Sequence, residues 1–466
     1  MHTLFRLRNA GHFALAGFAV LFMAAGGTAD AQNGMGGGSS SAELIVMPGA
    51  KVTTNGWADL ANGGEGMRYP DTKNIIYIGD DGYKIGDGNL TAYSSSVTKR
   101  KAFTNAIASG KVSSASVNEA AAIIVLSGMV DLSDGKVSDD DHSYFDAFNG
   151  SHKRKNGDIV YEIGSNKAII GVNGARVAFG GLMIYANKRD RSNIIIQNID
   201  FWDAHGSTEE DTKYNKDSKA SADNLLIESN TTTKNSKRYT TYDNVPKNIW
   251  VDHCRFSDGT CDDLVRNFNH DGAFDIKAGQ FVTVSYCEFT NHDKVTLLSP
   301  SDKFVNQEER QITFHHNYYH GAIQRMPRSR GCQVHLYNNI GTSGNGGYSL
   351  GPGIGSQYIV ENNYFGTHQS NMVKYFDAST STSADTFSRL YQSGNNITFT
   401  SSNMSKDKVE KASPDDVTKH LSPTAPWEVK YAYKDVLSAN SGLPALIPAV
   451  AGVGKITTVK VNGVSY

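Results

Sequence analysis

Residues 312–319 read Ile-Thr-Phe-His-His-Asn-Tyr-Tyr and contain the pattern that decides the fold of this chain. Apolar residues occupy its first and third positions, and an aromatic residue its eighth; we call the sixth position, here Asn317, the ladder position. Six copies of this template begin at residues 194, 249, 282, 312, 334 and 358, so successive copies start 55, 33, 30, 22 and 24 residues apart. The ladder residues are Ile199, Cys254, Cys287, Asn317, Asn339 and Asn363. A recurrence of this length with strand-like alternation is typical of stacked coils that share one core.

We therefore expect an all-β fold, a parallel β-helix whose neighbouring coils stack ~4.8 Å apart. A β-sandwich or propeller also uses many short strands, but sandwich hairpins favour two-residue Asn-Gly turns, and the connections here are longer and uneven. The 55-residue interval corresponds to two coils or to one coil with a large insertion. Residues 102–122 lack strand alternation and are expected to contain a short helix that caps the N-terminal end.

The ladder position has a structural consequence of its own. The three asparagines on consecutive coils are expected to form hydrogen bonds up and down the stack. Cys254 and Cys287 occupy the same position on two earlier coils, where a Cα separation of ~4.8 Å is compatible with a disulfide. Two stacked free thiols, or a Cys254–Cys261 bond that closes a loop, remain alternatives. The fourth cysteine is Cys332.

The N-terminus has the pattern of a secretory signal peptide. Arg6 and Arg8 precede an apolar run from Phe13 to Ala25, and Ala29-Asp30-Ala31 has the small residues of a cleavage site. The run is shorter than the ~20 residues that span a bilayer, so we expect no membrane partner. We predict a signal peptide over residues 1–31, a flexible Gly/Ser-rich lead-in over 32–41, and a single domain over 42–466. The protein is then secreted, extracellular or periplasmic.

The charged residues point to a local site for an anionic ligand. With 45 Lys and Arg against 47 Asp and Glu, the formal net charge is −2, so no global basic field favours a nucleic-acid partner. Lys294 and Arg325 follow successive ladder positions by seven and eight residues, and we expect them to face one groove. Asp223, Asp271 and Asp275 come from earlier coils and are expected to reach the same face. Three oxygen donors there suit a hard cation such as calcium.

Six motifs between Trp250 and Asn339 occur in the order found in the pectate lyases of the first polysaccharide lyase family, which this chain resembles. They are Trp250-Val-Asp-His253, Asp271-Gly-Ala-Phe-Asp-Ile-Lys277, Val282-Thr-Val-Ser-Tyr286, His292-Asp-Lys294, Phe314-His-His-Asn-Tyr-Tyr319 and Arg325-Met-Pro-Arg-Ser-Arg330. The resemblance implies a right-handed parallel β-helix that binds polygalacturonate in a groove. It also implies cleavage by calcium-assisted β-elimination to 4,5-unsaturated oligogalacturonides, at an alkaline optimum.

The resemblance further implies a role for each site residue. The calcium ligands are Asp223, Asp271 and Asp275; the contacts to the substrate carboxylate are Lys294 and Arg330; the catalytic base is Arg325. The sequence Ser221-Ala222-Asp223 departs from the Asp-x-Asp often found in the family, which implies a primary calcium site that is weaker or fills only with substrate.

Other residues near the motifs receive less specific predictions. Arg328 is expected to be a surface residue or a peripheral substrate contact. The histidines lack the spacing of a zinc site and are expected to be packed polar residues in the stack; they are His253, His292, His315 and His316.

Three other functions compete with this interpretation. A pectin lyase acting on methylated substrate has the same fold but lacks the calcium carboxylates, which are retained here. A β-helix glycoside hydrolase needs paired acids, and cations stand where the second acid pair would be. A non-catalytic, carbohydrate-binding β-helix would explain the repeat but not the cluster of Asp, Lys and Arg. We expect the protein to be a monomer.

Overall fold

The computed structural model describes residues 42–135, 160–186, 189–204, 223–232, 241–242, 244–260, 270–343, 347–366, 371–376, 387–407, 413–433, 436–440 and 442–466. The predicted signal peptide and lead-in, together with Ser221, Ala222 and Cys261, lie outside the described residues. Within them, no helix is both long and apolar enough to cross a membrane.

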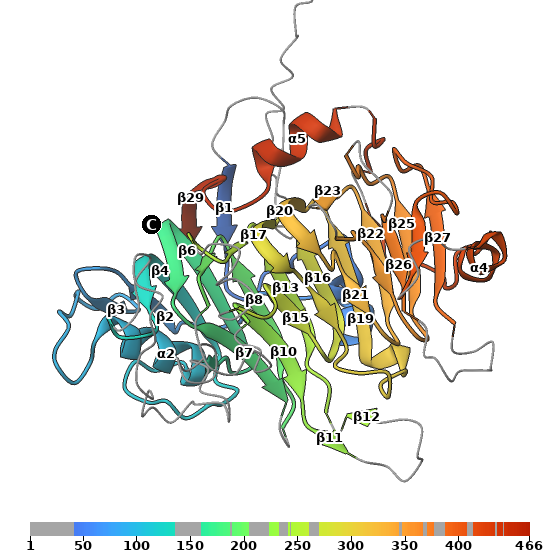
Figure 1. The fold of residues 1–466 in the computed structure, drawn as a ribbon. Coiled ribbons are helices and arrows are strands. Elements are labelled where there is room, and N and C mark those ends of the chain that lie inside the picture. The colour runs from blue at the N-terminus through green and yellow to red at the C-terminus, as the bar shows by residue number, and fades with distance from the viewer. Residues whose placement is uncertain are drawn as a thin grey trace, which may run out of the picture.

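The chain winds into a right-handed parallel β-helix, as predicted (Figure 1). One parallel sheet stacks the template copies in the expected register: Ile194 pairs with Ile249, and the series continues through Val282, Ile312, Val334 and Tyr358. Its strands are β8 (Ser192–Gln197), β13 (Lys247–Asp252), β16 (Gly279–Ser285), β19 (Arg310–His315), β22 (Gln333–Tyr337), β25 (Gln357–Glu361) and β27 (Arg389–Ser393). Because β8 pairs directly with β13, the 55-residue interval is one coil with a large insertion.

Each coil adds a strand to two further stacks. The second contains β9 (Asp200–Trp202), β14 (Arg255–Ser257), β17 (Glu288–Lys294), β20 (Tyr318–Gln324) and β23 (Ile340–Ser343). The third contains β5 (Val160–Glu162), β7 (Gly181–Ala186), β10 (Leu225–Ser229), β15 (Phe274–Ile276), β18 (Leu297–Leu298), β21 (Arg328–Ser329) and β24 (Gly351–Pro352). In the N-terminal coils, β4 (Ala122–Asp131) and β6 (Lys167–Ala178) run through the corner, so that β6 pairs with both β8 and β9.

The repeated side chains form continuous stacks in the core. Phe201, Phe256, Phe289 and Tyr319 stack face to face with ring centroids 4.8–5.1 Å apart. At the ladder position, Asn317 donates to Asn339 and Asn339 to Asn363, each at 2.9 Å, as predicted. The ladder continues to Asn395, which the template did not include. Cys254, Cys287 and Cys332 are buried free thiols, which settles the open choice in favour of stacked thiols.

Helices and short strands cover one end of the β-helix and parts of its sides. The predicted N-terminal cap is α2 (Lys99–Ser109), which begins after Thr98, ends at left-handed Gly110 and packs on β4. Other N-terminal elements are η1 (Trp57–Leu60), α1 (Ala61–Gly64), β2 (Ile75–Ile78) and β3 (Tyr83–Ile85). The hairpin of β11 (Thr231–Thr232) and β12 (Thr241–Tyr242) and the turn η3 (Gln307–Glu309) lie between coils. The C-terminal elements are β26 (Val373–Tyr375), β28 (Met404–Lys406), α4 (Pro414–His420), α5 (Leu443–Val450), β29 (Ile456–Val461) and β30 (Val464–Ser465), and β29 pairs with β1 (Ala42–Val46).

Candidate active site

The third stack of strands brings the three predicted aspartates together. Asp223 and Asn224 immediately precede β10, and Asp275 lies in the middle of β15, where Phe274 and Ile276 point into the core. Strands β10 and β15 are neighbours, with Leu226 opposite Asp275. One carboxylate oxygen from each of Asp223, Asp271 and Asp275 lies within 4.8 Å of the others. The alternation of a short strand therefore turns Asp275 outward toward the other two carboxylates.

The surroundings of these carboxylates fit a cation. Oδ1 of Asp223 accepts a hydrogen bond from the Gly272 N–H at 2.7 Å, and Oδ1 of Asp275 accepts one from the Leu297 N–H at 2.8 Å. The Oδ2 atoms of both are buried and have no hydrogen-bond partner within the described part of the chain. A Cβ atom at position 272 would collide with both carboxylates, so glycine leaves this space open. Clustered oxygen donors of this kind are the preferred ligands of calcium.

The three carboxyl groups have different proton affinities. Burial, reinforced by the neighbouring Asp275, raises the pKa of Asp223 well above its usual value. Burial also raises the pKa of Asp275 to about 6, although Lys277 opposes the rise. For Asp271, burial alone would raise the pKa, but the ion pair with Lys294 outweighs it and the pKa is lowered. The site thus carries a surplus of buried negative charge that a bound cation would neutralise.

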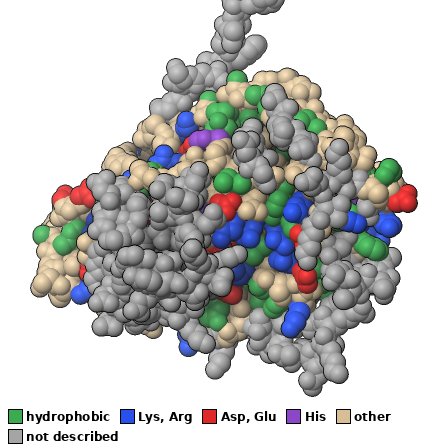
Figure 2. Space-filling model, viewed as in Figure 1, with side chains coloured by type: hydrophobic (Ala, Val, Ile, Leu, Met, Phe, Trp, Pro, Cys, Tyr) green, Lys and Arg blue, Asp and Glu red, His purple; other side chains and the backbone are tan. Residues whose placement is uncertain are grey.

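Lys294 contacts one of the carboxylates, and Arg325 lies on the next coil. Lys294 ends β17, and its Nζ lies 2.8 Å from Oδ1 of Asp271. Arg325 stands between β20 and β21 with a left-handed φ of 66°, uncommon for a residue other than glycine. It is close enough to lower the pKa of both Asp271 and Asp275. Figure 2 shows Lys and Arg side chains gathered with acidic ones in the middle of this face, over the region of β15 and β21.

The two other arginines of the motif lie farther along the same stack. Nε of Arg330 contacts Oδ1 of Asp302 at 2.5 Å, so its charge is shared with an exposed carboxylate. The guanidinium carbon of Arg328 lies 3.8 Å from the centre of the Phe376 ring. Burial lowers the pKa of Arg328, so it is not the freely solvated surface residue that was one of its two predicted roles.

Two residues of this region were not identified from the sequence. Nζ of Lys277 lies 3.9 Å from Oδ2 of Asp223; it belongs to a quoted motif, and its position two residues after Asp275 was the available signal. Tyr348 packs against Phe376, and burial raises the pKa of its hydroxyl, while Arg328 and Arg325 lower it. Tyr348 lies outside the template copies, so no sequence signal pointed to it.

The predicted packed histidines are buried. Nδ1 of His253 lies 2.8 Å from Asp252, and the Nδ1 atoms of His315 and His316 lie 2.9 Å apart. His292 contacts Asp258. Among the described residues, the only group of three or more potential metal ligands with atoms this close together is the three aspartates.

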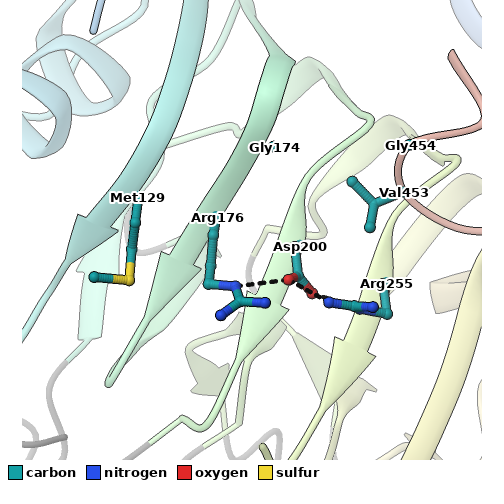
Figure 3. A pocket seen from close by; sticks show the side chains of 7 residues that line it. All are labelled: Met129, Gly174, Arg176, Asp200, Arg255, Val453 and Gly454. Carbon is teal, nitrogen blue, oxygen red and sulfur yellow. Dashed lines mark hydrogen bonds and ion pairs between the residues drawn. The ribbon is translucent and has the colours of Figure 1, made fainter. Parts of the chain in front are cut away.

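A cavity of about 310 Å³ lies on the second stack of strands, apart from the aspartates (Figure 3). Nε of Arg176 donates to Asp200 at 2.7 Å, and Nε and Nη2 of Arg255 donate to the same carboxylate at 2.8 and 2.6 Å. The cavity is lined by Met129, Gly174, Arg176, Asp200, Arg255, Val453 and Gly454. None of the predicted site residues lines it. Because one buried carboxylate already engages both guanidinium groups, we place the candidate active site at the aspartates.

Comparison with known proteins agrees with this geometry. A family model described as pectate lyase matches residues 66–455. A pectate trisaccharide-lyase of Thermotoga maritima is 36% identical over 205 residues, which cover 42% of this chain and 44% of that protein. A pectate lyase of Bacillus subtilis is 29% identical over 279 residues, covering 55% of this chain and 59% of that protein. The matched region thus spans less than half of the first relative.

Solved structures match over a longer range. A thermostable pectate lyase is 25% identical with a TM-score of 0.57, and the match covers 86% of this chain and 97% of that one. A pectate lyase bound to a hexasaccharide has a TM-score of 0.55 and the same coverage at 21% identity, which is evidence for the fold alone. The β-helix is therefore shared along nearly the whole length of these proteins.

Proposed function

This chain belongs to the pectate lyase family, and from that premise we propose that it cleaves α-1,4-polygalacturonate by calcium-assisted β-elimination. The observation that carries the proposal is the meeting of three carboxylates with Lys294 and Arg325 on one face. A glycoside hydrolase would use one carboxylic acid on each side of the scissile bond, whereas here the carboxylates lie together and are accompanied by cations. The products are oligogalacturonides with an unsaturated non-reducing end.

Calcium is the cofactor that this donor set fits. Asp223, Asp271 and Asp275 would hold it, using the buried oxygens that lack hydrogen-bond partners in the described residues. When bound, calcium supplies positive charge next to the uronate carboxylate and makes the neighbouring C5 proton more acidic. Because residue 272 is glycine, both carboxylates approach the main chain there more closely than a side chain would allow.

The chain's own cations complete the site. Lys294 and Arg330 donate hydrogen bonds to the uronate carboxylate and stabilise the negative charge that develops on it, an effect of ~3 kcal/mol per donor in comparable sites. Arg325 takes the C5 proton, O4 leaves with the bonding electrons, and a C4–C5 double bond forms without the addition of water.

Product analysis tests this proposal directly. The purified protein is incubated with polygalacturonate in calcium, in excess chelator, and in isotopically labelled water. We expect ultraviolet absorbance from the new double bond to grow with each cut in calcium and to stop in chelator. Saturated ends carrying label from water would show hydrolysis and overturn both the lyase assignment and the role of Arg325.

We further propose that the protein is secreted and acts as a monomer. The support for secretion is the N-terminal pattern that ends at Ala31, which lies outside the described residues. Protein recovered from the culture medium should begin at Gln32, and light scattering should give the mass of one chain. Retention of residues 1–31 in the exported protein would contradict the signal peptide.

A further inference from the structure

Four buried ionisable side chains lie behind the three aspartates: Asp203, Asp258, His270 and His292, each no more than 2% exposed. Asp203 directly follows β9, Asp258 directly follows β14, and His292 lies in β17, so the group joins three successive coils. His270 immediately precedes Asp271 in the chain. We call this group the buried acid–imidazole network.

The contacts of the network end on the main chain of Asp271. Nε2 of His270 lies 2.6 Å from Oδ1 of Asp203, and its Nδ1 lies 3.9 Å from Oδ1 of Asp258. The same oxygen of Asp258 contacts Nδ1 of His292. On the other side of the ring, Nε2 of His292 lies 3.2 Å from the carbonyl oxygen of Asp271. Asp258 is thus linked to Asp271 through one imidazole ring.

The chemistry of the partners fixes the direction of the last contact. A carbonyl oxygen only accepts hydrogen bonds, so Nε2 of His292 carries the hydrogen and donates it to Asp271. Asp258 contacts Nδ1 on the opposite side of the same ring, so the ring lies between Asp258 and the Asp271 carbonyl. The Asp271 carbonyl therefore accepts a hydrogen bond from a buried side chain that is enclosed on its other side.

The place of this contact connects it to the cation site. Asp271 provides one of the three carboxylates, and the next residue, Gly272, donates its N–H to Asp223 at 2.7 Å. A shift of the Asp271 carbonyl would displace both that carboxylate and the N–H that orients Asp223. Buried ionic groups are often no more stabilising than apolar residues of similar volume, so this network is better explained by positioning than by stability.

We propose that the buried acid–imidazole network positions Asp271 for calcium, with His292 and Asp258 as positioning residues that contact neither the ion nor the substrate. This inference rests on the proposed function, since calcium binding at the three aspartates belongs to that proposal. Partners behind metal ligands typically contribute about 10- to 100-fold to metal affinity, which sets the size of the expected effect.

The test is calcium titration by calorimetry on the purified protein without substrate. His292→Leu removes the donor, and calcium affinity should fall about 10- to 100-fold. His292→Gln can still donate an N–H to the Asp271 carbonyl and should recover most of the affinity. In polygalacturonate cleavage, the calcium concentration for half-maximal rate should rise by the same factor in His292→Leu, whereas kcat at saturating calcium should fall by less than that factor.

A matched control separates positioning from general destabilisation. His335 is also a buried histidine beside a carboxylate, 3.3 Å from Glu361, but it lies on the first stack of strands. His335→Leu should lower the thermal midpoint and leave calcium affinity unchanged. If His292→Leu fails to fold, Asp258→Leu replaces it, because leucine offers Nδ1 neither a donor nor an acceptor, and calcium affinity should fall in the same direction.

The outcomes distinguish this inference from the proposed function. Wild-type calcium affinity in folded His292→Leu and Asp258→Leu, or an equal loss in His335→Leu, would overturn the network's role and leave the cation site intact. A wild-type protein that binds no calcium, even with polygalacturonate present, would overturn the cation site and this inference together.

Discussion

Asp275→Asn should make the calcium-free protein more stable, because Asp275 is ionised at neutral pH against its environment. The pKa of Asp275 is about 6 in the folded protein, against 3.8 for an ordinary aspartate. At about 1.4 kcal/mol per pH unit, this difference corresponds to about 3 kcal/mol. Burial is the largest cause of the raised pKa; Lys277 opposes it, and the neighbouring charge of Asp271 adds to it.

The pH dependence has a definite sign. Because the folded-state pKa of Asp275 is raised, its carboxyl does not lower the free energy of unfolding below pH ~4, where it is protonated in both states. The loss of stability grows as pH rises from ~4 to ~6 and is complete above ~6. Asparagine removes the charge and keeps the oxygen that accepts from the Leu297 N–H. We therefore expect the free energy of unfolding of Asp275→Asn in chelator to exceed that of the wild type by up to about 3 kcal/mol at pH 8, with no gain at pH 4.

Urea unfolding in chelator at both pH values measures this difference, and Asp252→Asn is the control. Asp252 is also fully buried, but its pKa is lowered: burial opposes the lowering, and the contacts with His253, Ser285 and Gln197 outweigh burial. The free energy of unfolding of Asp252→Asn at pH 8 should therefore fall below that of the wild type, which is the opposite change to that expected for Asp275→Asn. In excess calcium the wild type should gain more stability than Asp275→Asn, since only it keeps the full ligand set. An Asp275→Asn protein no more stable than the wild type in chelator at pH 8 would refute the reasoning.

Three further predictions concern the base, the cation and the thiols. Arg325→Lys keeps a cation but loses the planar guanidinium, so substrate binding should survive while kcat falls roughly 10²- to 10⁴-fold in steady-state kinetics; unchanged kcat would contradict its role as the base. Calcium affinity measured by calorimetry should weaken as pH falls through about 6, because protons compete with calcium for Asp275. The loss should reach up to about tenfold per pH unit for each proton displaced, and a calcium affinity that stays constant from pH 8 to 5 would contradict this. Replacing Cys254 and Cys287 together by Ala should lower stability by about 2 kcal/mol in thermal unfolding and leave the rate per folded molecule nearly intact, and a large loss of rate in folded protein would show a functional role.

The architecture could be predicted because the apolar, ladder and aromatic positions recur in the sequence at intervals of one coil. Each template copy places apolar residues at its first and third positions, and a shift of one residue would turn those side chains away from the core. The register of Ile249 on Ile194 and Val282 follows from that pattern alone. The 55-residue interval was ambiguous because an insertion adds residues without adding a coil, and the repeat spacing does not distinguish an insertion from an additional coil.

The meeting of the three aspartates was also predictable, but their proton affinities were not. The positions of Asp223 and Asp275 follow from the strands that they precede or occupy. Burial and mutual repulsion raise the pKa of both, while an ion pair lowers that of Asp271. These effects depend on distances between side chains of different coils, and the sequence specifies the coils without specifying those distances.

Lys294 shows that the position of a residue within a coil predicts which face it lies on but does not predict its contacts. Its place seven residues after a ladder position predicted that it would lie on the same face as Arg325, and in the structure it pairs with Gln324, the residue before Arg325 on the next coil. The same spacing gave no reason to expect its Nζ 2.8 Å from Asp271, because that aspartate reaches the groove after an insertion whose path periodicity does not describe. The ion pair with Lys294 lowers the pKa of Asp271 against the effect of burial, and the proposed function also gives Lys294 the substrate carboxylate as a partner. Under that proposal, replacing Lys294 should weaken calcium binding and substrate binding together.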